Sequence, residues 1–171
     1  FGSPLEKEGA IRHTYPSAVE LATAGEQALR DLGCGFRAPY LARAAETVAR
    51  GALSLSELRH ADYPETLEAL TALYGGGDKI ADCVMLFSLD KMEAFPADRW
   101  VLKALRDWYG LSSMTRYRDT RRWAWGRFGG DAGYANQYLF WNVRQSTRPL
   151  RSSATIGTAA DSKSASRRPS L

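Results

Sequence analysis

The spacing of apolar residues predicts a chain of short helices. Leu67, Leu70 and Leu73 recur every three residues, which places them on one face of a helix that Pro64 would open. No stretch alternates between apolar and polar side chains as a half-buried strand does. Residues 1–16 are expected to be irregular because glycines and prolines interrupt them. The pattern therefore predicts an all-α, multi-helical domain.

Capping residues set the boundaries of the expected helices. Ser17 and Ser54 are each followed three residues later by glutamate, which is the pattern of a capping box. Ile80, Val84 and Phe87 follow an i, i+4, i+7 spacing, so we expect them to form the buried stripe of their helix. The expected helices cover residues 17–32, 39–50, a short segment from 54, 63–73, 79–90, 98–109, 120–128 and 131–144.

Charge and composition divide the chain into a domain and a tail. Residues 1–145 hold equal numbers of basic and acidic side chains, whereas residues 146–171 supply the whole formal net charge of +4. The tail is rich in Ser, Thr, Ala, Arg and Lys and lacks aromatic residues. Such a segment cannot bury enough apolar area to offset the entropy of ordering it. We expect one domain over residues 1–145 and a disordered basic tail over residues 146–171.

The domain itself is polarised. Residues 99–145 carry nine basic and three acidic side chains, whereas residues 1–98 carry nine and fifteen. A basic half favours a polyanion such as DNA as the partner. The arginines between positions 116 and 122 also suit a solvated helix start, so this alternative stays open.

Neither the cysteines nor any apolar run indicates secretion or a membrane. Cys34 and Cys83 do not make a disulfide framework, and the sequence has no signal-like or membrane-spanning stretch. We therefore expect an intracellular protein with reduced cysteines. We also expect a monomer that is associated with DNA, in the cytoplasm, nucleoid or nucleus. The chain starts at Phe1 rather than at methionine, so we interpret it as an N-terminally truncated fragment.

Three consecutive glycines, Gly75 to Gly77, precede the helix that Lys79 opens. Ordering three glycines is costly, which indicates a backbone that needs positive φ or a close approach to another group. We expect that group to be a DNA phosphate, because the N–H groups at the start of a helix attract an anion. The same helix dipole disfavours the Lys79 ammonium and favours the free amine, the nucleophile of Schiff-base chemistry.

A nucleotide-binding P-loop is excluded by the residues around the same turn. Asp78 separates Gly77 from Lys79, Ile80 follows the lysine in place of Ser or Thr, and the preceding segment is a predicted helix rather than a strand. Asp98 precedes the next predicted helix. By residue type alone, it is an ordinary helix N-cap.

The glycine turn and the residues after it resemble the 8-oxoguanine DNA glycosylase family, within the helix-hairpin-helix, Gly/Pro-Asp superfamily. The likeness is carried by Gly75–Cys83, Leu89-Asp90-Lys91 and Phe95–Asp98, and more weakly by Leu32–Ala38, Ala132–Ala135 and Leu139-Phe140. It spans roughly residues 1–145, in order. It implies a base-excision repair enzyme that removes 8-oxoguanine or a related oxidised purine. Such an enzyme then nicks the strand by Schiff-base lyase chemistry, a β-elimination.

The resemblance also implies roles for individual residues. Lys79 would attack C1′ of a flipped-out nucleotide, and Asp98 would stabilise the positive charge that develops there. The residues implied in the base pocket are Cys83, Phe140, Asn136 and Gln137, of which Asn136 is in register with the family's glutamine. The residues implied in DNA contact are Gly75, Gly76, Gly77, Phe36, Arg37 and Trp100.

No cofactor is expected to be required for this reaction. The resemblance implies a structural monovalent cation at the hairpin, held by the backbone carbonyls of Thr71, Leu73 and Gly76. Two cysteines cannot supply the four ligands of the iron–sulfur cluster that some relatives carry. Two other functions stay open: a non-catalytic helix-hairpin-helix DNA-binding module, and a glycosylase of the same fold that acts on another lesion.

Overall fold

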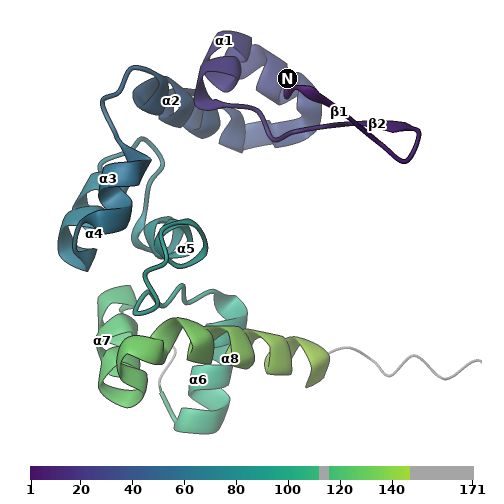
Figure 1. The fold of residues 1–171 in the computed structure, drawn as a ribbon. Coiled ribbons are helices and arrows are strands. Elements are labelled where there is room, and N and C mark those ends of the chain that lie inside the picture. The colour runs from purple at the N-terminus through teal and green to yellow at the C-terminus, as the bar shows by residue number, and fades with distance from the viewer. Residues whose placement is uncertain (112–115, 147–171) are drawn as a thin grey trace, which may run out of the picture.

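The computed structural model describes residues 1–111 and 116–146 and is mostly helical (Figure 1). Its elements are β1 (Pro4–Lys7), β2 (Ala10–His13), α1 (Ala18–Leu29), the π-turn η1 (Arg30–Cys34), the 3₁₀ turn η2 (Gly35–Arg37), α2 (Ala38–Ala49), α3 (Leu55–His60), α4 (Tyr63–Thr71), α5 (Asp78–Ser88), α6 (Arg99–Tyr109), α7 (Tyr117–Phe128), the 3₁₀ turn η3 (Gly129–Asp131) and α8 (Ala132–Ser146). The predicted all-α, multi-helical class is confirmed. None of the helices in the described ranges has both the length and the apolar character that crossing a membrane requires.

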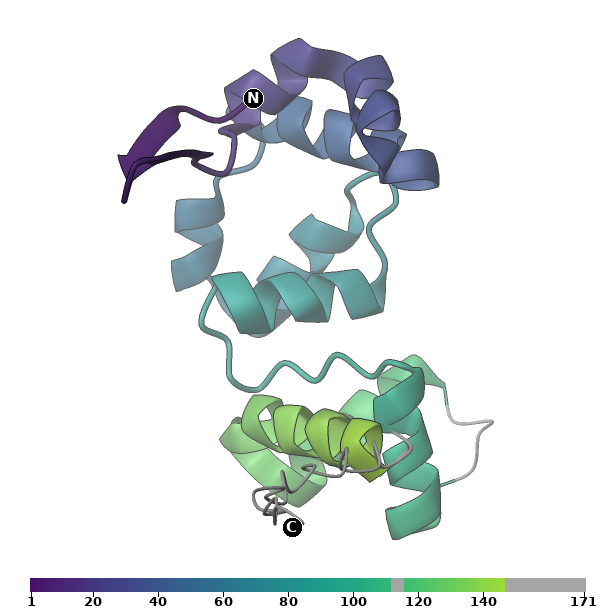
Figure 2. The same ribbon diagram turned by 90° about the vertical axis from the view of Figure 1, so that its right-hand side faces the viewer.

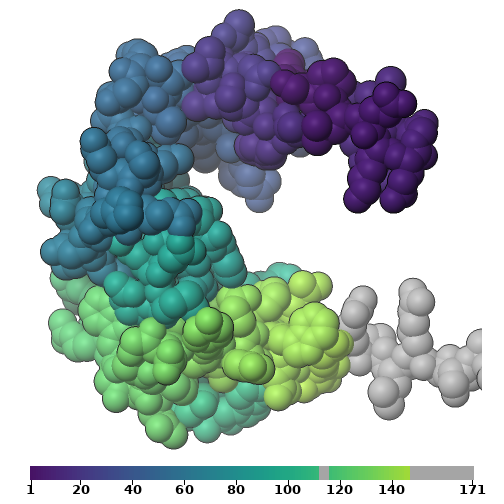
Figure 3. Space-filling model, in the orientation of Figure 1, coloured from purple at the N-terminus to yellow at the C-terminus, as the bar shows by residue number. Residues whose placement is uncertain are grey.

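The helices form three tiers that curve into an open C (Figures 1 and 3). Each tier has its own small core. The first tier, α1 and α2, packs Leu29 against Ala38 and Ala42. The second, α3 to α5, buries a cluster that includes Met85. The third, α6 to α8, buries a cluster that includes Phe95.

The segment between α5 and α6 joins the second tier to the third and runs alongside α8 (Figure 2). Two observations show how close this approach is. The Gly133 N–H donates to the Met92 carbonyl at 2.7 Å, and a Cβ added to Gly133 would lie 2.7 Å from the same carbonyl oxygen. Only glycine fits here, and this packing fixes the segment that ends at Asp98.

The first residues form an antiparallel β-hairpin, so the expected irregular start, without strands, is wrong. Lys7 pairs with Ala10 across a two-residue turn, in which Glu8 and Gly9 both have positive φ, 54° and 75°. This is the pattern of a type I′ turn, whose usual signal is Asn-Gly or Asp-Gly. The eight strand residues are all exposed, so burial does not impose the alternation that identifies a strand in a sequence.

The helix α5 buries a different face from the one expected. Its buried residues are Ala81, Asp82, Met85 and Leu86. Ile80 and Phe87, two members of the expected stripe, are 53% and 62% exposed. The prediction is wrong because an acidic residue, Asp82, lies on the buried face, where an apolar pattern does not detect it.

The expected helix limits hold to within a few residues. The Ser17 capping box forms in both directions with Glu20. Helix α1 ends at Leu29 and continues into η1, in which Gly33 has a left-handed φ of 84°. One departure is Gly25, whose φ of 73° interrupts α1. Helix α8 reaches Ser146, and residues 147–171 lie outside the described ranges, so the disordered tail stays a prediction.

Candidate active site

The three glycines of the turn between α4 and α5 have different surroundings. Gly75 has φ of 80°, and a Cβ there would lie 2.6 Å from the Tyr40 ring. A Cβ on Gly76 would lie 2.3 Å from the Leu70 carbonyl oxygen. Gly77 has open space around its missing Cβ and is the N-cap of α5, without a capping side chain. The predicted close approaches therefore occur within the protein at the first two glycines, whereas Gly77 is exposed and its N–H makes no hydrogen bond with a described residue.

Lys79 is the second residue of α5 and is exposed. Its ammonium makes no ion pair or hydrogen bond with any residue in the described ranges. The partial positive charge at the helix start acts against a cation there. The side chain is thus available for chemistry and is not engaged in holding the fold.

Asp98 is the N-cap of α6, as its residue type predicts. Its Oδ1 accepts the backbone N–H groups of Trp100 and Val101, both at 2.9 Å. Its Oδ2 makes no hydrogen bond with a residue in the described part of the chain. The two N–H groups fix the orientation of the carboxylate, and one oxygen stays available to a ligand.

Both residues line one cavity of about 130 Å³ between α5, the segment before α6, and α8. The complete lining is Lys79, Cys83, Phe87, Pro96, Asp98, Asn136, Gln137 and Phe140. All six residues that the resemblance places at the catalytic centre or in the base pocket therefore meet here. The structure brings together positions that lie up to 61 residues apart in the sequence, from Lys79 to Phe140.

Cys83 lies one helical turn after Lys79, on the same side of α5. Burial is the main cause that raises the pKa of its thiol, and the charges of Asp82 and Asp98 act in the same direction. The Lys79 charge opposes them without cancelling them. Cys83 is therefore a neutral thiol at neutral pH and not a competing nucleophile.

The two amides of α8 have different surroundings. Asn136 is 2% exposed, and its Nδ2 donates to the Pro96 carbonyl at 3.1 Å. Its Oδ1 accepts from Nε2 of Gln137 at 3.1 Å. Gln137 is exposed, and its Oε1 has no hydrogen-bond donor among the described residues. Asn136 thus holds the loop, and Gln137 retains a free acceptor at the cavity.

Two aromatic side chains border the cavity. Phe140 is half-buried against the core of the third tier. Phe87 was assigned to the core from its spacing, yet it is exposed and lines the cavity. Its position was detectable by a different spacing, since Lys79, Cys83 and Phe87 follow each other at i, i+4 and i+8 on one helix face.

The other residues implied in DNA contact lie outside the cavity lining. Phe36 is 66% exposed, with the Arg37 guanidinium 4.5 Å from its ring centre. A chain of edge-to-face rings runs from Phe36 through Tyr40 to Tyr74 at the glycine turn, with centroid separations of 6.5 and 5.3 Å. Trp100 is half-buried against the third-tier core. Their contact with DNA stays a prediction.

A buried polar cluster lies behind the cavity. Asp82 is 0% exposed; its Oδ1 accepts from the Tyr63 hydroxyl, and its Oδ2 accepts from the Tyr117 hydroxyl at 2.7 Å. Arg121 completes the cluster through Nη2, 3.2 Å from Asp82 Oδ2 and 3.4 Å from Asp78 Oδ1. The Arg121 side chain is 6% exposed, so this arginine belongs neither to a DNA footprint nor to a solvated helix start.

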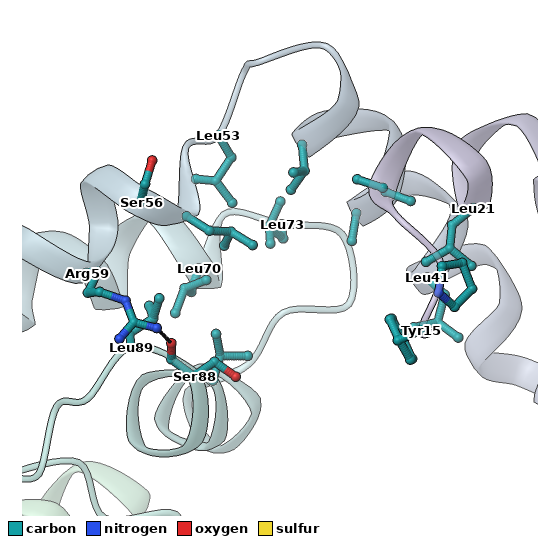
Figure 4. Close-up of a pocket in the computed structure, with 17 residues that line it drawn as sticks. Tyr15, Leu21, Leu41, Leu53, Ser56, Arg59, Leu70, Leu73, Ser88 and Leu89 are labelled. Atoms are coloured by element: carbon teal, nitrogen blue, oxygen red, sulfur yellow. Dashed lines mark hydrogen bonds between the residues drawn. The ribbon is translucent and has the colours of Figure 1, made fainter. Parts of the chain in front are cut away.

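A second cavity of about 740 Å³ opens between the first and second tiers (Figure 4). Its walls are mainly Leu, Val and Ala side chains. The guanidinium of Arg59 points to its edge and donates to the Ser88 carbonyl at 2.6 Å. The lining of this larger cavity includes no amine and no carboxylate. The cavity of about 130 Å³ is therefore the candidate active site, although its volume is smaller.

Known N-glycosylase/DNA lyases are similar to this chain in sequence. A probable N-glycosylase/DNA lyase of Methanothermobacter thermautotrophicus is 29% identical over 165 residues, which cover 85% of this chain and 52% of that protein. N-glycosylase/DNA lyase OGG1 of Arabidopsis thaliana is 31% identical over 143 residues, which cover 78% of this chain and 39% of that protein. No family model matches the chain.

A solved structure has the same fold. The 8-oxoguanine glycosylase/lyase of Clostridium acetobutylicum, in complex with double-stranded DNA containing cytosine opposite 8-oxoguanine, superposes with a TM-score of 0.80 at 34% identity. The superposition covers 85% of this chain and 50% of that chain. The chain thus spans about half the length of the relatives it matches, or less.

Proposed function

Because this chain belongs to the 8-oxoguanine DNA glycosylase family of the helix-hairpin-helix, Gly/Pro-Asp superfamily, we propose that it acts in base-excision repair as a bifunctional DNA glycosylase and lyase. The proposed substrate is duplex DNA with 8-oxoguanine or a related oxidised purine, which places its action inside the cell. One observation carries the proposal. Lys79 and Asp98 line the same cavity, and the lysine has no acidic partner among the described residues.

In the proposed reaction, Lys79 acts as the nucleophile. Its neutral amine attacks C1′ of the flipped-out nucleotide, and the bond from C1′ to the base breaks with the electron pair leaving on the base, which takes a proton. The sugar ring then opens as C1′–O4′ breaks, O4′ takes a proton, and the nitrogen of Lys79 forms an imine with C1′. Loss of a proton from C2′ expels the 3′-phosphate oxygen and nicks the strand 3′ to the lesion.

Asp98 supports this reaction by its charge. As the base departs, positive charge develops at C1′ and the ring oxygen, and a fixed carboxylate stabilises it. Two backbone N–H groups already bind Oδ1, so the carboxylate need not reorganise during the reaction. The free Oδ2 is the atom that we propose faces the sugar.

The other residues of the pocket would hold the extruded base. We propose that Phe140 and Phe87 hold the faces or edges of the extruded base, since both are aromatic and border the cavity. Gln137 offers Oε1 as an acceptor to a base N–H, and Asn136 holds both Gln137 and the Pro96 carbonyl in position. A base that carries an extra N–H, as an oxidised purine does, suits such an acceptor.

The hairpin would hold the DNA backbone. The exposed Gly77, whose N–H has no partner among the described residues, and the start of α5 suit a phosphate. A monovalent cation would be held by the carbonyls of Thr71, Leu73 and Gly76. These carbonyls fit a monovalent cation, because carbonyl oxygens bind such ions. Among the described residues, the Thr71 and Gly76 carbonyls accept no backbone hydrogen bond other than those within helices. The Leu73 carbonyl already accepts the Gly76 N–H at 2.7 Å, which leaves its second lone pair for the ion.

A single-turnover assay on a panel of lesion duplexes tests this function. The panel contains 8-oxoguanine, a ring-opened purine, an alkylated base and an oxidised pyrimidine, each opposite cytosine and adenine. We expect base release and strand nicking with 8-oxoguanine and neither with the alkylated base. Binding to every duplex without release or nicking would contradict the proposal and identify a DNA-binding module. Release of only the alkylated base or the oxidised pyrimidine would identify a same-fold enzyme for another lesion.

A further inference from the structure

The buried cluster around Asp82 reaches both parts of the candidate active site. Asp82 lies three residues after Lys79 on α5, and both belong to one rigid helix. Its Oδ2 accepts the Tyr117 hydroxyl at 2.7 Å. The same hydroxyl accepts the backbone N–H of Ala97 at 3.3 Å, and Ala97 directly precedes Asp98. One phenol oxygen therefore connects the helix of the lysine to the loop of the aspartate.

We infer that Tyr117 is a positioning residue, which sets the separation of Lys79 and Asp98 by bridging the Asp82 carboxylate to the Ala97 N–H. This inference rests on the proposed function of the cavity. Helix α7 contributes no residue to the lining of the cavity. The inference gives this helix a role in fixing the distance between the two reacting groups.

The bridge is a directed hydrogen-bond path. A phenol has one proton to donate. Tyr117 donates it to Asp82 Oδ2 at 2.7 Å, since the other acceptor, the Phe95 carbonyl, is farther away at 3.4 Å, and the phenol oxygen accepts from Ala97. Burial, together with the Asp82 carboxylate, raises the pKa of the Tyr117 phenol far above its ordinary value. The donor is thus present throughout the pH range of enzyme assays.

Two side chains hold the end of the loop, directly before Asp98. The Asn136 amide holds the Pro96 carbonyl from α8, and Tyr117, at the start of α7, holds the next residue. Ala97 itself is 5% exposed, so water cannot readily replace a lost partner of its N–H. Removing the Tyr117 hydroxyl should leave that N–H unsatisfied and allow the loop to shift relative to α5.

Tyr63 supplies a matched control. Its hydroxyl donates to the other oxygen of the same carboxylate, its phenol pKa is raised by the same two causes, and it is buried. No hydrogen bond joins Tyr63 to the Asp98 loop among the described residues. Tyr63→Phe and Tyr117→Phe therefore remove similar bonds to Asp82, and only the second breaks the bridge.

The experiment compares Tyr117→Phe, Tyr63→Phe and the wild-type chain in two measurements. The first is single-turnover base release beside affinity for a duplex with a non-reactive abasic analogue. We expect release by Tyr117→Phe to slow by about tenfold to a hundredfold, as a misplaced reacting group does, with unchanged affinity and with Tyr63→Phe close to wild type. Equal rates in the two variants would overturn the inference.

The second measurement is hydrogen exchange of the Ala97 amide, which needs no activity. We expect exchange to accelerate in Tyr117→Phe and to stay at the wild-type rate in Tyr63→Phe. Unchanged Ala97 exchange in Tyr117→Phe would overturn the bridge. If the wild-type chain released no base, the proposed function would fail, and the exchange result would still decide whether the bridge exists.

Discussion

At the scale of residues, Lys79 and Asp98 occupy equivalent places with opposite charges. Each lies at the start of a helix, where the dipole works against the ammonium and stabilises the carboxylate. Their residue types and helix positions could be predicted from the sequence. Their meeting in one cavity could not be derived from local pattern, since it depends on the loop that Tyr117 and Asn136 hold.

Asp98 combines two roles that one substitution can separate. Asn is as good a helix N-cap as Asp, so Asp98→Asn should change the free energy of unfolding by less than about 0.5 kcal/mol. It removes the charge, so base release should slow by about a hundredfold or more. Asp98→Ala should lose about 1 kcal/mol of stability in addition. Thermal melts and single-turnover rates measure the two effects, and full activity in Asp98→Asn would refute a role for the charge.

At the scale of elements, capping residues predicted helix starts well, and burial patterns did not predict the buried faces. Ser17 and Asp98 are N-caps at the expected positions. The β-hairpin was missed because its exposed strands need no alternation and its turn begins with Glu8. The face of α5 was missed because Asp82 is buried by pairing with side chains that lie 19 to 39 residues away. Such pairing leaves no local trace in a sequence.

Gly76 and Gly77, two neighbouring glycines of the turn, should differ in the stability that is lost on substitution by alanine. At Gly76→Ala the new Cβ would meet the Leu70 carbonyl, which is backbone and cannot move aside. We expect a loss of about 1–3 kcal/mol in unfolding free energy and weaker duplex binding. At Gly77→Ala there is open space and an extended backbone, so the loss should be about 0.5 kcal/mol. Denaturant unfolding checks both, and equal losses would show that the turn does not depend on this close approach.

At the scale of the whole molecule, the chain is a curved body with three small cores rather than one (Figure 3). The candidate active site lies between the second and third tiers, where the α5–α6 segment joins them. The polarity of charge along the sequence favoured DNA as the partner. The structure changes which residues carry that argument, because Arg121 is buried while Arg116, Arg118 and Arg122 stay exposed.

The central claim is that the amine of Lys79 becomes covalently joined to damaged DNA. Borohydride reduction during the reaction with an 8-oxoguanine duplex tests it, because reduction of the imine leaves a stable protein–DNA adduct. Lys103→Gln is the matched control, since Lys103 pairs with Asp107 on α6 and does not line the cavity. We predict an adduct with the wild-type chain and with Lys103→Gln, and none with Lys79→Gln. An adduct of wild-type yield in Lys79→Gln would contradict the account.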